Sequence, residues 1–148
     1  MFRGSSAHTL DSKGRIIIPT RFRQVIRDGG GDAVMITRMD RSLFAYTLEG
    51  WGKIEEKVLA LAEKSPEMRR FRRVVIGGAF ECPCDKQGRV LIPPTLRKYA
   101  KLEKDIVLVG VTDHFEIWSS DNWETENELL ENDMLKEDFR GEISRLGL

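Results

Sequence analysis

Two stretches decide the fold, Asp11-Ser12-Lys13-Gly14-Arg15-Ile16-Ile17-Ile18-Pro19 and Asp85-Lys86-Gln87-Gly88-Arg89-Val90-Leu91-Ile92-Pro93, which align at an offset of 74 residues. In each, an aspartate leads through a glycine turn to an arginine, an aliphatic run and a proline. Glycine adopts the positive φ that a tight turn demands, and the β-branched run favours a strand that the proline ends. The recurrence indicates that the chain contains one small module twice.

The likeness between the two copies continues beyond the prolines. At the same offset, Phe22, Arg23, Val25 and Ile26 align with Leu96, Arg97, Tyr99 and Ala100. This apolar i, i+3, i+4 pattern predicts a short helix in each copy, with a basic residue at the same place. Residues 32–36 align with 105–109, and residues 43–46 with 115–118, after small changes of offset. Each copy therefore predicts a strand, a tight turn, a strand, a short helix, two strands joined by a hairpin, and a longer helix.

These patterns divide the chain into four parts. We expect modules over residues 5–52 and 77–124, a helical spacer over residues 53–76, and a C-terminal helix over residues 125–148. Helical patterns cover residues 49–73, with a break at Ser65-Pro66, and residues 123–146. The C-terminal pattern sets apolar residues among acids, so packing on its own chain and packing across a subunit boundary both stay open. Further strands are expected near the following residues: 3–10, 33–38, 43–47, 105–111 and 115–119.

Composition fits a globular chain with an uneven distribution of charge. The 148 residues, 41% of them hydrophobic, suffice for one compact domain or for two modules that share a core. The net charge is zero, but residues 1–115 carry 21 Lys+Arg against 14 Asp+Glu, a difference of +7, and residues 116–148 carry 3 against 10, a difference of −7. Such asymmetry points to a polyanion-binding surface, although an acidic, solvated helix beside a mildly basic domain explains it equally well.

Several classes of protein are disfavoured. No apolar run approaches the roughly 18 residues of a membrane span, and residues 1–6 lack the apolar core of a secretory signal, so we expect a cytoplasmic protein. Cys82 and Cys84 are separated by one proline, a spacing poorly suited to a mutual disulfide, and reduced thiols are the simpler interpretation. With His8 and His114 they supply zinc-binding residue types without a characteristic metal spacing, so we expect no metal and no cofactor.

The repeated turn carries the candidate binding residues. Arginine suits phosphate and guanine because its planar fork bonds bidentately, so Arg15 and Arg89 are the leading candidates. An aspartate at the start of a turn accepts backbone N–H bonds and can orient an arginine four residues on, whereas a carboxylate facing DNA would repel phosphate. A plain turn with a solvated arginine would explain one copy, but its recurrence favours a function. The remaining residues of this candidate site are Asp11, Lys13, Gly14, Asp85, Lys86 and Gly88.

A second basic cluster follows the spacer helix. Arg69, Arg70, Arg72 and Arg73 place four arginines within five residues. They fit a secondary phosphate-contacting patch. They fit equally a solvated helix end, or a partner for the acidic tail of a neighbouring subunit, and the alternatives stay open.

The two signature stretches, their spacing, the opening Met-Phe-Arg-Gly-Ser and the helices after each copy resemble the MraZ family of transcriptional regulators, relatives of the AbrB and SpoVT swapped-hairpin domains. The resemblance implies a mainly β fold with flanking helices, in which two tandem AbrB/SpoVT-like modules form a pseudo-two-fold swapped-hairpin β-barrel. It also implies ring-shaped homo-oligomers that bind short direct repeats upstream of the division and cell-wall gene cluster. Asp11 with Arg15, and Asp85 with Arg89, fall on the family's Asp-x-x-x-Arg positions. Gln87 stands where the first copy has Lys13, so the second turn is expected to contribute less positive charge to DNA contact.

The leading hypothesis is therefore a sequence-specific regulator that binds double-stranded DNA as a homo-oligomer, in the cytoplasm and associated with the nucleoid. Repeated DNA boxes would convert modest single-site affinity into avidity. The alternative is an oligomeric scaffold or protein-binding ring whose turns contact protein carboxylates. An enzyme and a small-molecule substrate are disfavoured, because the pattern supplies arginines and turn acids without a base, a nucleophile or a metal cluster.

Overall fold

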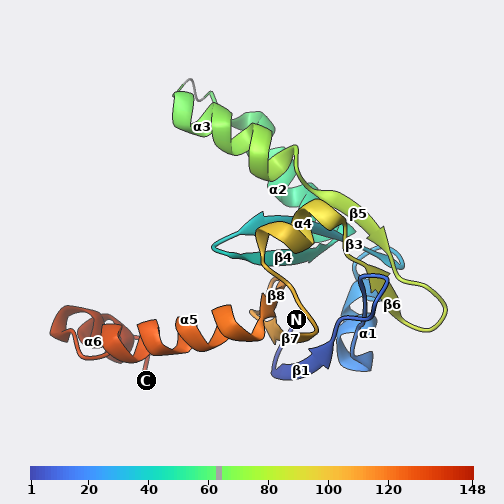
Figure 1. Cartoon of the computed structure of the whole chain (residues 1–148). Helices are drawn as coiled ribbons and strands as arrows, with labels where there is room; N and C mark the ends of the chain where they lie inside the picture. The colour runs from blue at the N-terminus through green and yellow to red at the C-terminus, as the bar shows by residue number, and fades with distance from the viewer. Residues whose placement is uncertain (63–64) are drawn as a thin grey trace.

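The computed structural model describes residues 1–62 and 65–148, and Figure 1 shows their arrangement. The fold is mostly β with helices, as expected. Within the described residues the strands are β1 (Ser5–Thr9), β2 (Arg15–Ile17), β3 (Ala33–Met39), β4 (Ser42–Thr47), β5 (Phe80–Pro83), β6 (Arg89–Leu91), β7 (Asp105–Gly110) and β8 (Phe115–Ser119). The helices are α1 (Thr20–Asp28), α2 (Leu48–Ala60), α3 (Pro66–Phe71), the π-helical turn η1 (Arg72–Ile76), α4 (Pro94–Tyr99), α5 (Ser120–Asp133) and α6 (Glu137–Ser144).

The strands of the two copies are interleaved in space. Six of them form an antiparallel sheet in the order β1-β7-β8-β4-β3-β5, and β2 pairs with β6 in a separate two-stranded ladder. The first strand of each copy thus pairs inside the other copy: β1 with β7, and β5 with β3. If each strand is replaced by its counterpart in the other copy, the same strand order results, read from the opposite edge of the sheet. The topology therefore keeps the internal duplication seen in the sequence.

The expected β-barrel is not formed, because the six-stranded sheet is open and ends at β1 and β5. The strands β2 and β6 bond to each other and are not part of that sheet. Each has only three residues between a glycine turn and a proline, and proline cannot donate to a ladder. The ladder therefore stands beside the sheet as a separate unit.

One core joins the ladder, the sheet and the short helices. Phe22 of α1 lies against Phe2 and Phe115, with ring centroids 5.3 and 5.0 Å away. Ile16 and Val90, which face each other at the centre of the ladder, are both fully buried. Residues of both copies form this core, so neither copy buries these side chains alone.

Two helical arms leave this core in different directions (Figure 1). One arm consists of α2, α3 and η1. The spacer helix expected over residues 49–73 is interrupted here: α2 ends at Ala60, residues 63–64 lie outside the described residues, and Ser65 caps α3 by accepting a hydrogen bond from the N–H of Met68 at 3.1 Å. Among the described residues of α3 and η1, no side chain is buried.

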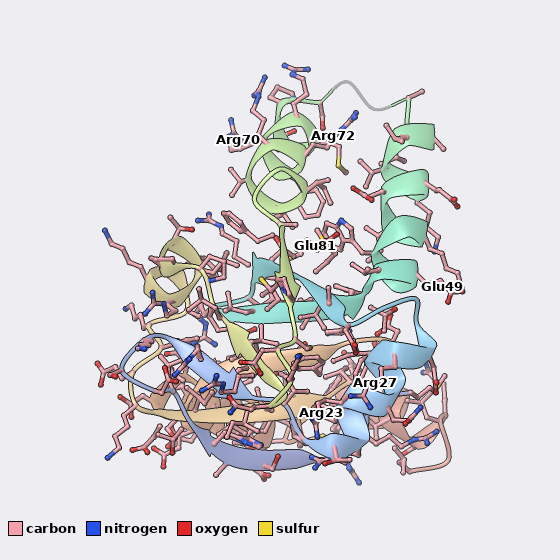
Figure 2. The ribbon with its side chains drawn as sticks, turned by 90° about the vertical axis from the view of Figure 1, so that its right-hand side faces the viewer. Arg23, Arg27, Glu49, Arg70, Arg72 and Glu81 are labelled. Carbon is pink, nitrogen blue, oxygen red and sulfur yellow. The ribbon has the colours of Figure 1, made fainter. Side chains whose placement is uncertain are left out.

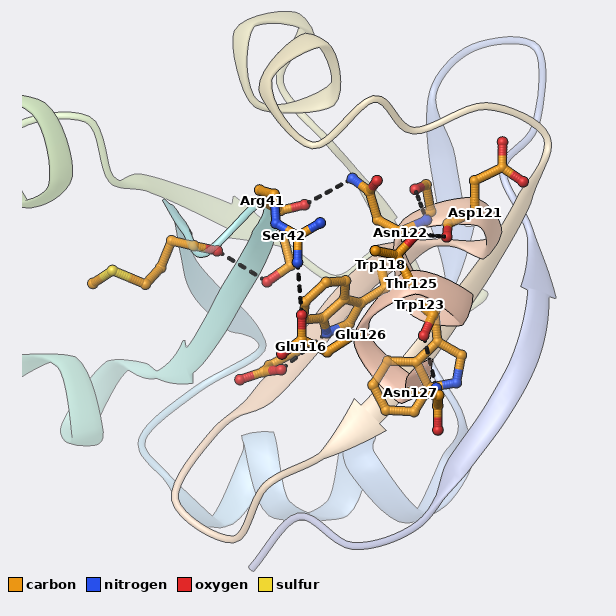
Figure 3. A network of polar contacts seen from close by, with 12 residues as sticks. Arg41, Ser42, Glu116, Trp118, Asp121, Asn122, Trp123, Thr125, Glu126 and Asn127 are labelled. Carbon is orange, nitrogen blue, oxygen red and sulfur yellow. Dashed lines mark hydrogen bonds and ion pairs between the residues drawn. The ribbon is translucent and has the colours of Figure 1, made fainter. Parts of the chain in front are cut away.

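The second arm consists of α5 and α6, where the sequence predicted one continuous helix. The helix ends at Asp133 and resumes at Glu137, since the preceding Asn132-Asp133 pair consists of poor helix formers. Figure 3 shows how its base is held: Arg41 Nη2 pairs with Glu126 Oε2 at 2.7 Å, and Asn122 Nδ2 donates to the Arg41 carbonyl at 3.3 Å. No helix among the described residues combines the length and apolar content that a membrane span requires.

The aromatic cluster gives a test of the shared core. Phe22→Ala should lower the free energy of unfolding by about 3–5 kcal/mol, the usual loss for a buried phenylalanine. Phe80→Ala is the matched control, because Phe80 is 44% exposed on β5 and should cost about 1 kcal/mol. Urea unfolding measures both, and equal losses would contradict the placement of Phe22 in the core.

Candidate nucleic-acid interface

Two matching turns precede the strands of the ladder. In the first, the N–H of Gly14 donates to the carbonyl of Asp11 at 3.0 Å, and the N–H of Asp11 donates to the carbonyl of Arg15 at 2.9 Å. The second turn repeats both bonds at 2.9 Å, from Gly88 to Asp85 and from Asp85 to Arg89. The glycines have φ of 84° and 76°, values at which a side chain would be strained. The turns predicted from the repeat are therefore built alike.

Each aspartate holds its own turn and its arginine. Asp11 Oδ1 accepts from the N–H groups of Lys13 and Arg15, both at 2.9 Å, while Oδ2 accepts from Arg15 Nε at 2.8 Å. The backbone N–H of Arg15 is the largest influence that lowers the pKa of Asp11, to about 2, and the guanidinium adds to it. Asp11 is thus ionised at neutral pH.

The second turn repeats this arrangement atom for atom. Asp85 Oδ1 accepts from the N–H groups of Gln87 and Arg89 at 2.9 and 2.8 Å, and Oδ2 accepts from Arg89 Nε at 2.8 Å. The backbone hydrogen bond from Arg89 is again the leading cause that lowers the pKa of Asp85. Gln87 takes part through its backbone, so its departure from lysine removes a charge without altering the turn.

These bonds leave the outer parts of both guanidinium groups available. The side chains of Arg15 and Arg89 are 28% and 30% exposed. Each makes its aspartate contact through Nε, and the Nη atoms make no hydrogen bond to any residue that the structure describes. Both arginines are therefore fixed at one nitrogen while two further donor groups remain open to a ligand.

The ladder sets the two turns at its opposite ends. Antiparallel pairing puts Arg15 opposite Leu91 and Ile17 opposite Arg89. The carbonyls of the turn glycines bond across: Gly14 accepts from the N–H of Ile92 at 2.9 Å, and Gly88 from the N–H of Ile18 at 2.8 Å. In Figure 1 this unit lies at the right, on the side away from α5 and α6.

Two further arginines, Arg23 and Arg97, belong to this site, and the sequence pattern did not single them out as candidates. The Arg97 guanidinium packs on Gly14 and that of Arg23 packs on Gly88, so closely that a Cβ added to either glycine would collide with it. The Nε atoms of Arg23 and Arg97 are buried without a hydrogen-bond partner among the described residues. The sequence signal that could have identified Arg23 and Arg97 is their matched position in the two copies, after Pro19 and Pro93. Each turn is thus clamped by an arginine of the other copy.

The second basic cluster lies elsewhere. Figure 2 shows Arg70 and Arg72 at the far end of the arm of α2, α3 and η1, well away from Arg23. The structure brings the eight turn residues into one unit and leaves residues 69–73 outside it. Lys13 and Lys86 are exposed at the turn tips.

The residues weighed as zinc ligands are not gathered in one place. His114 contacts Asp113 and Glu116 at 2.7 and 2.9 Å, whereas His8 contacts Ser6 at 2.7 Å. Burial raises the pKa of Cys82 to about 11. Residues 1–62 and 65–148 hold no group of three or more His, Cys, Asp or Glu side chains arranged for a metal ion.

Comparisons with known proteins agree with this duplicated arrangement. The family model described as "MraZ protein, putative antitoxin-like" matches the chain twice, over residues 1–74 and 75–142. The transcriptional regulator MraZ of Desulforapulum autotrophicum is 57% identical over 148 residues, and that of Desulfosudis oleivorans is 56% identical over 148 residues; both matches cover 100% of each chain.

A third relative, the transcriptional regulator MraZ of Syntrophobacter fumaroxidans, is 51% identical over 118 residues, 80% of this chain and 79% of the relative. These relatives are named as transcriptional regulators and not as enzymes. The two family matches and the full-length identities confirm the resemblance carried by the repeated turns: the chain belongs to the MraZ family.

Proposed function

We propose that this protein is a transcriptional regulator that binds specific sequences of double-stranded DNA through the two turns and the ladder between them. The observation that carries the proposal is the pair of arginines, each held at Nε by an aspartate and open at Nη, at opposite ends of one two-stranded ladder. The names of the relatives support a regulatory role.

A two-stranded ribbon fits the major groove of B-DNA, which is about 12 Å wide. Arg15 and Arg89 would then donate to guanine edges or phosphate oxygens, and Lys13 and Lys86 would add point charges at the turn tips. Because the aspartates already hold the arginines, little side-chain freedom is lost on binding. Asp11 and Asp85 act as positioning residues and do not face the duplex.

Membership of the MraZ family supports further features of this function. The targets are short direct repeats upstream of the division and cell-wall gene cluster, and the protein works in the cytoplasm, associated with the nucleoid. The chain divides into modules 5–52 and 77–124, the spacer 53–76 and the C-terminal helix 125–148. The exchange of β1 and β5 between copies supports a swapped-hairpin relationship between the modules.

The two arms support assembly into a homo-oligomer that is closed as a ring. Leu129 and Leu130 of α5 and Leu135, between α5 and α6, are between 47% and 82% exposed, and neither helix has a buried side chain. Residues 120–148 carry nine acidic and three basic residues, a net charge of −6, whereas residues 65–76 carry four arginines and one glutamate, a net charge of +3.

The two arms of one chain point apart, so their complementary charges can meet only between copies (Figure 1). A head-to-tail contact of this kind closes into a ring when the rotation permits. The basic cluster of residues 69–73 then contacts the acidic arm of a neighbouring subunit. Any arginine of this cluster that lies outside the contact between subunits provides a secondary contact to phosphate. A scaffold ring without DNA specificity is the competing function, favoured only by these exposed arms.

The turn arginines give the first test. Arg15→Ala and Arg89→Ala should each weaken binding to an operator from the protein's own upstream region by about 1–3 kcal/mol, and the double variant should also flatten the dependence of affinity on salt. Lys53→Ala, on α2, removes one charge away from the ladder and is the control. Gel-shift titration at several salt concentrations measures the effect. Unchanged binding by the double variant would refute the role of the turns, and binding without preference for the operator would favour the scaffold.

The hydrogen bonds of the Asp11 carboxylate to its turn and to Arg15 predict a defined pH dependence of stability. The pKa of Asp11 is about 2 in the folded chain against an ordinary value of 3.8, so its stabilising effect is present above about pH 4 and is lost as the pH falls towards 2. Wild type should therefore melt at a higher temperature than Asp11→Asn at pH 6, and the difference should vanish near pH 2. Thermal unfolding by circular dichroism measures it. A difference in melting temperature that stays constant from pH 6 to pH 2 would contradict a stabilising role of the ionised Asp11 carboxylate.

Assembly is tested by reversing charges on the arms. Arg70→Glu combined with Arg73→Glu should lower the mass of the oligomer in light scattering, and so should Glu128→Lys combined with Glu131→Lys. In a mixture of the two variants every contact between unlike copies is complementary again, so an alternating oligomer of wild-type mass should form. Oligomers of wild-type mass from both variants would exclude this pairing of arms.

A further inference from the structure

The outward face of the ladder carries more than arginines. Along β2 and β6 the side chains alternate, so Ile16 and Val90 point into the core while Arg15, Ile17, Arg89 and Leu91 share the opposite face. The register sets Arg15 against Leu91 and Ile17 against Arg89. The four side chains thus form a quartet in which the two arginines occupy one diagonal and the two aliphatic residues the other.

Both aliphatic members of this quartet are open to solvent. Ile17 is 60% exposed and Leu91 is 54% exposed, whereas the residues next to them in each strand are buried. Two bulky aliphatic side chains on a three-residue ladder contribute little to the core in this position. Exposed apolar groups framed by charged ones are typical of a contact surface.

We propose that Ile17 and Leu91 contact the C5 methyl groups of two thymines in the major groove, and so set base preference together with the arginines. The inference rests on the proposed DNA binding. Among the base edges of that groove, the thymine methyl is the apolar group that an aliphatic side chain can recognise, while guanine and phosphate are taken by arginine. The quartet therefore offers partners for both kinds of group on one face.

The register also fixes a spacing for the two thymines. Ile17 and Leu91 are diagonal neighbours across the ladder, and such pairs lie about 7–8 Å apart. Successive bases are spaced by about 3.4 Å along the helix axis, so this separation corresponds to about two base steps. The pair should read two thymine methyls that stand about two steps apart.

A protein partner is the other possible occupant of this face, and the charges disfavour it. Each aliphatic residue lies opposite an ionised guanidinium whose Nη atoms bond to no described residue. The guanidinium groups of Arg23 and Arg97 lie against the same turns. An apolar protein interface would bury the Nη donors without acceptors, which is costly, whereas a duplex supplies phosphates beside its methyl groups.

The test uses DNA fragments that the full-length protein selects from a random pool. Each thymine of a selected duplex is replaced in turn by uracil, which lacks only the methyl group. We expect two positions, about two steps apart, at which this change weakens binding about fourfold, as for loss of one buried methyl. Ile17→Ala should abolish the effect at one position and Leu91→Ala at the other. Ile17→Val should keep the effect, because it leaves a branched aliphatic side chain at that position.

The contrary results are distinct. If uracil has no effect at any position while binding still depends on Arg15 and Arg89, the methyl contact is wrong and the proposed function stands. If Ile17→Ala and Leu91→Ala change the mass of the oligomer but not its DNA preference, the face is a protein contact and the inference fails. If the protein selects no sequence at all, the inference fails together with the proposed function.

Discussion

The carboxylate of Asp11 accepts hydrogen bonds from the backbone N–H groups of Lys13 and Arg15 and from Arg15 Nε, and Asp85 repeats this arrangement in the second copy. These bonds close the turn and fix the direction of the arginine, while its Nη atoms bond to none of the residues that the structure describes. Because the carboxylate must be ionised to hold the guanidinium, charge and backbone geometry are coupled in each turn. The candidate interface follows from this coupling: without it, the arginines would be two flexible surface side chains.

Duplication makes the two turns parts of one unit. The carbonyl of each turn glycine accepts a hydrogen bond from a backbone N–H of the other copy, and each turn glycine is covered by an arginine of the other copy. The first strand of each copy likewise pairs inside the other, and both copies fill one core. A change in one turn therefore acts on the opposite end of the ladder, and the protein can present two arginines at a fixed separation although each module is small.

Local patterns in the sequence predicted the turns, the strands beside them, the short helices and the role of the aspartates, because each depends on neighbouring residues. The open sheet was not predictable in this way: whether β2 pairs with β6 or closes a barrel depends on distant strands. The clamp formed by Arg23 and Arg97 needs the same long-range contacts. The exposure of Ile17 was equally hidden, since it lies in an aliphatic run that reads as core. The break between α5 and α6 follows Asn132-Asp133, two residues with low helix propensity. The prediction of one continuous helix gave more weight to the apolar pattern than to this low propensity.

The most direct measurement of the central claim is the crystal structure of the protein bound to a duplex that it selects. We expect Nη atoms of both Arg15 and Arg89 within hydrogen-bond distance of guanine or phosphate oxygens, while their Nε atoms remain on Asp11 and Asp85. A duplex seated on another surface, with both turns facing solvent, would contradict the account.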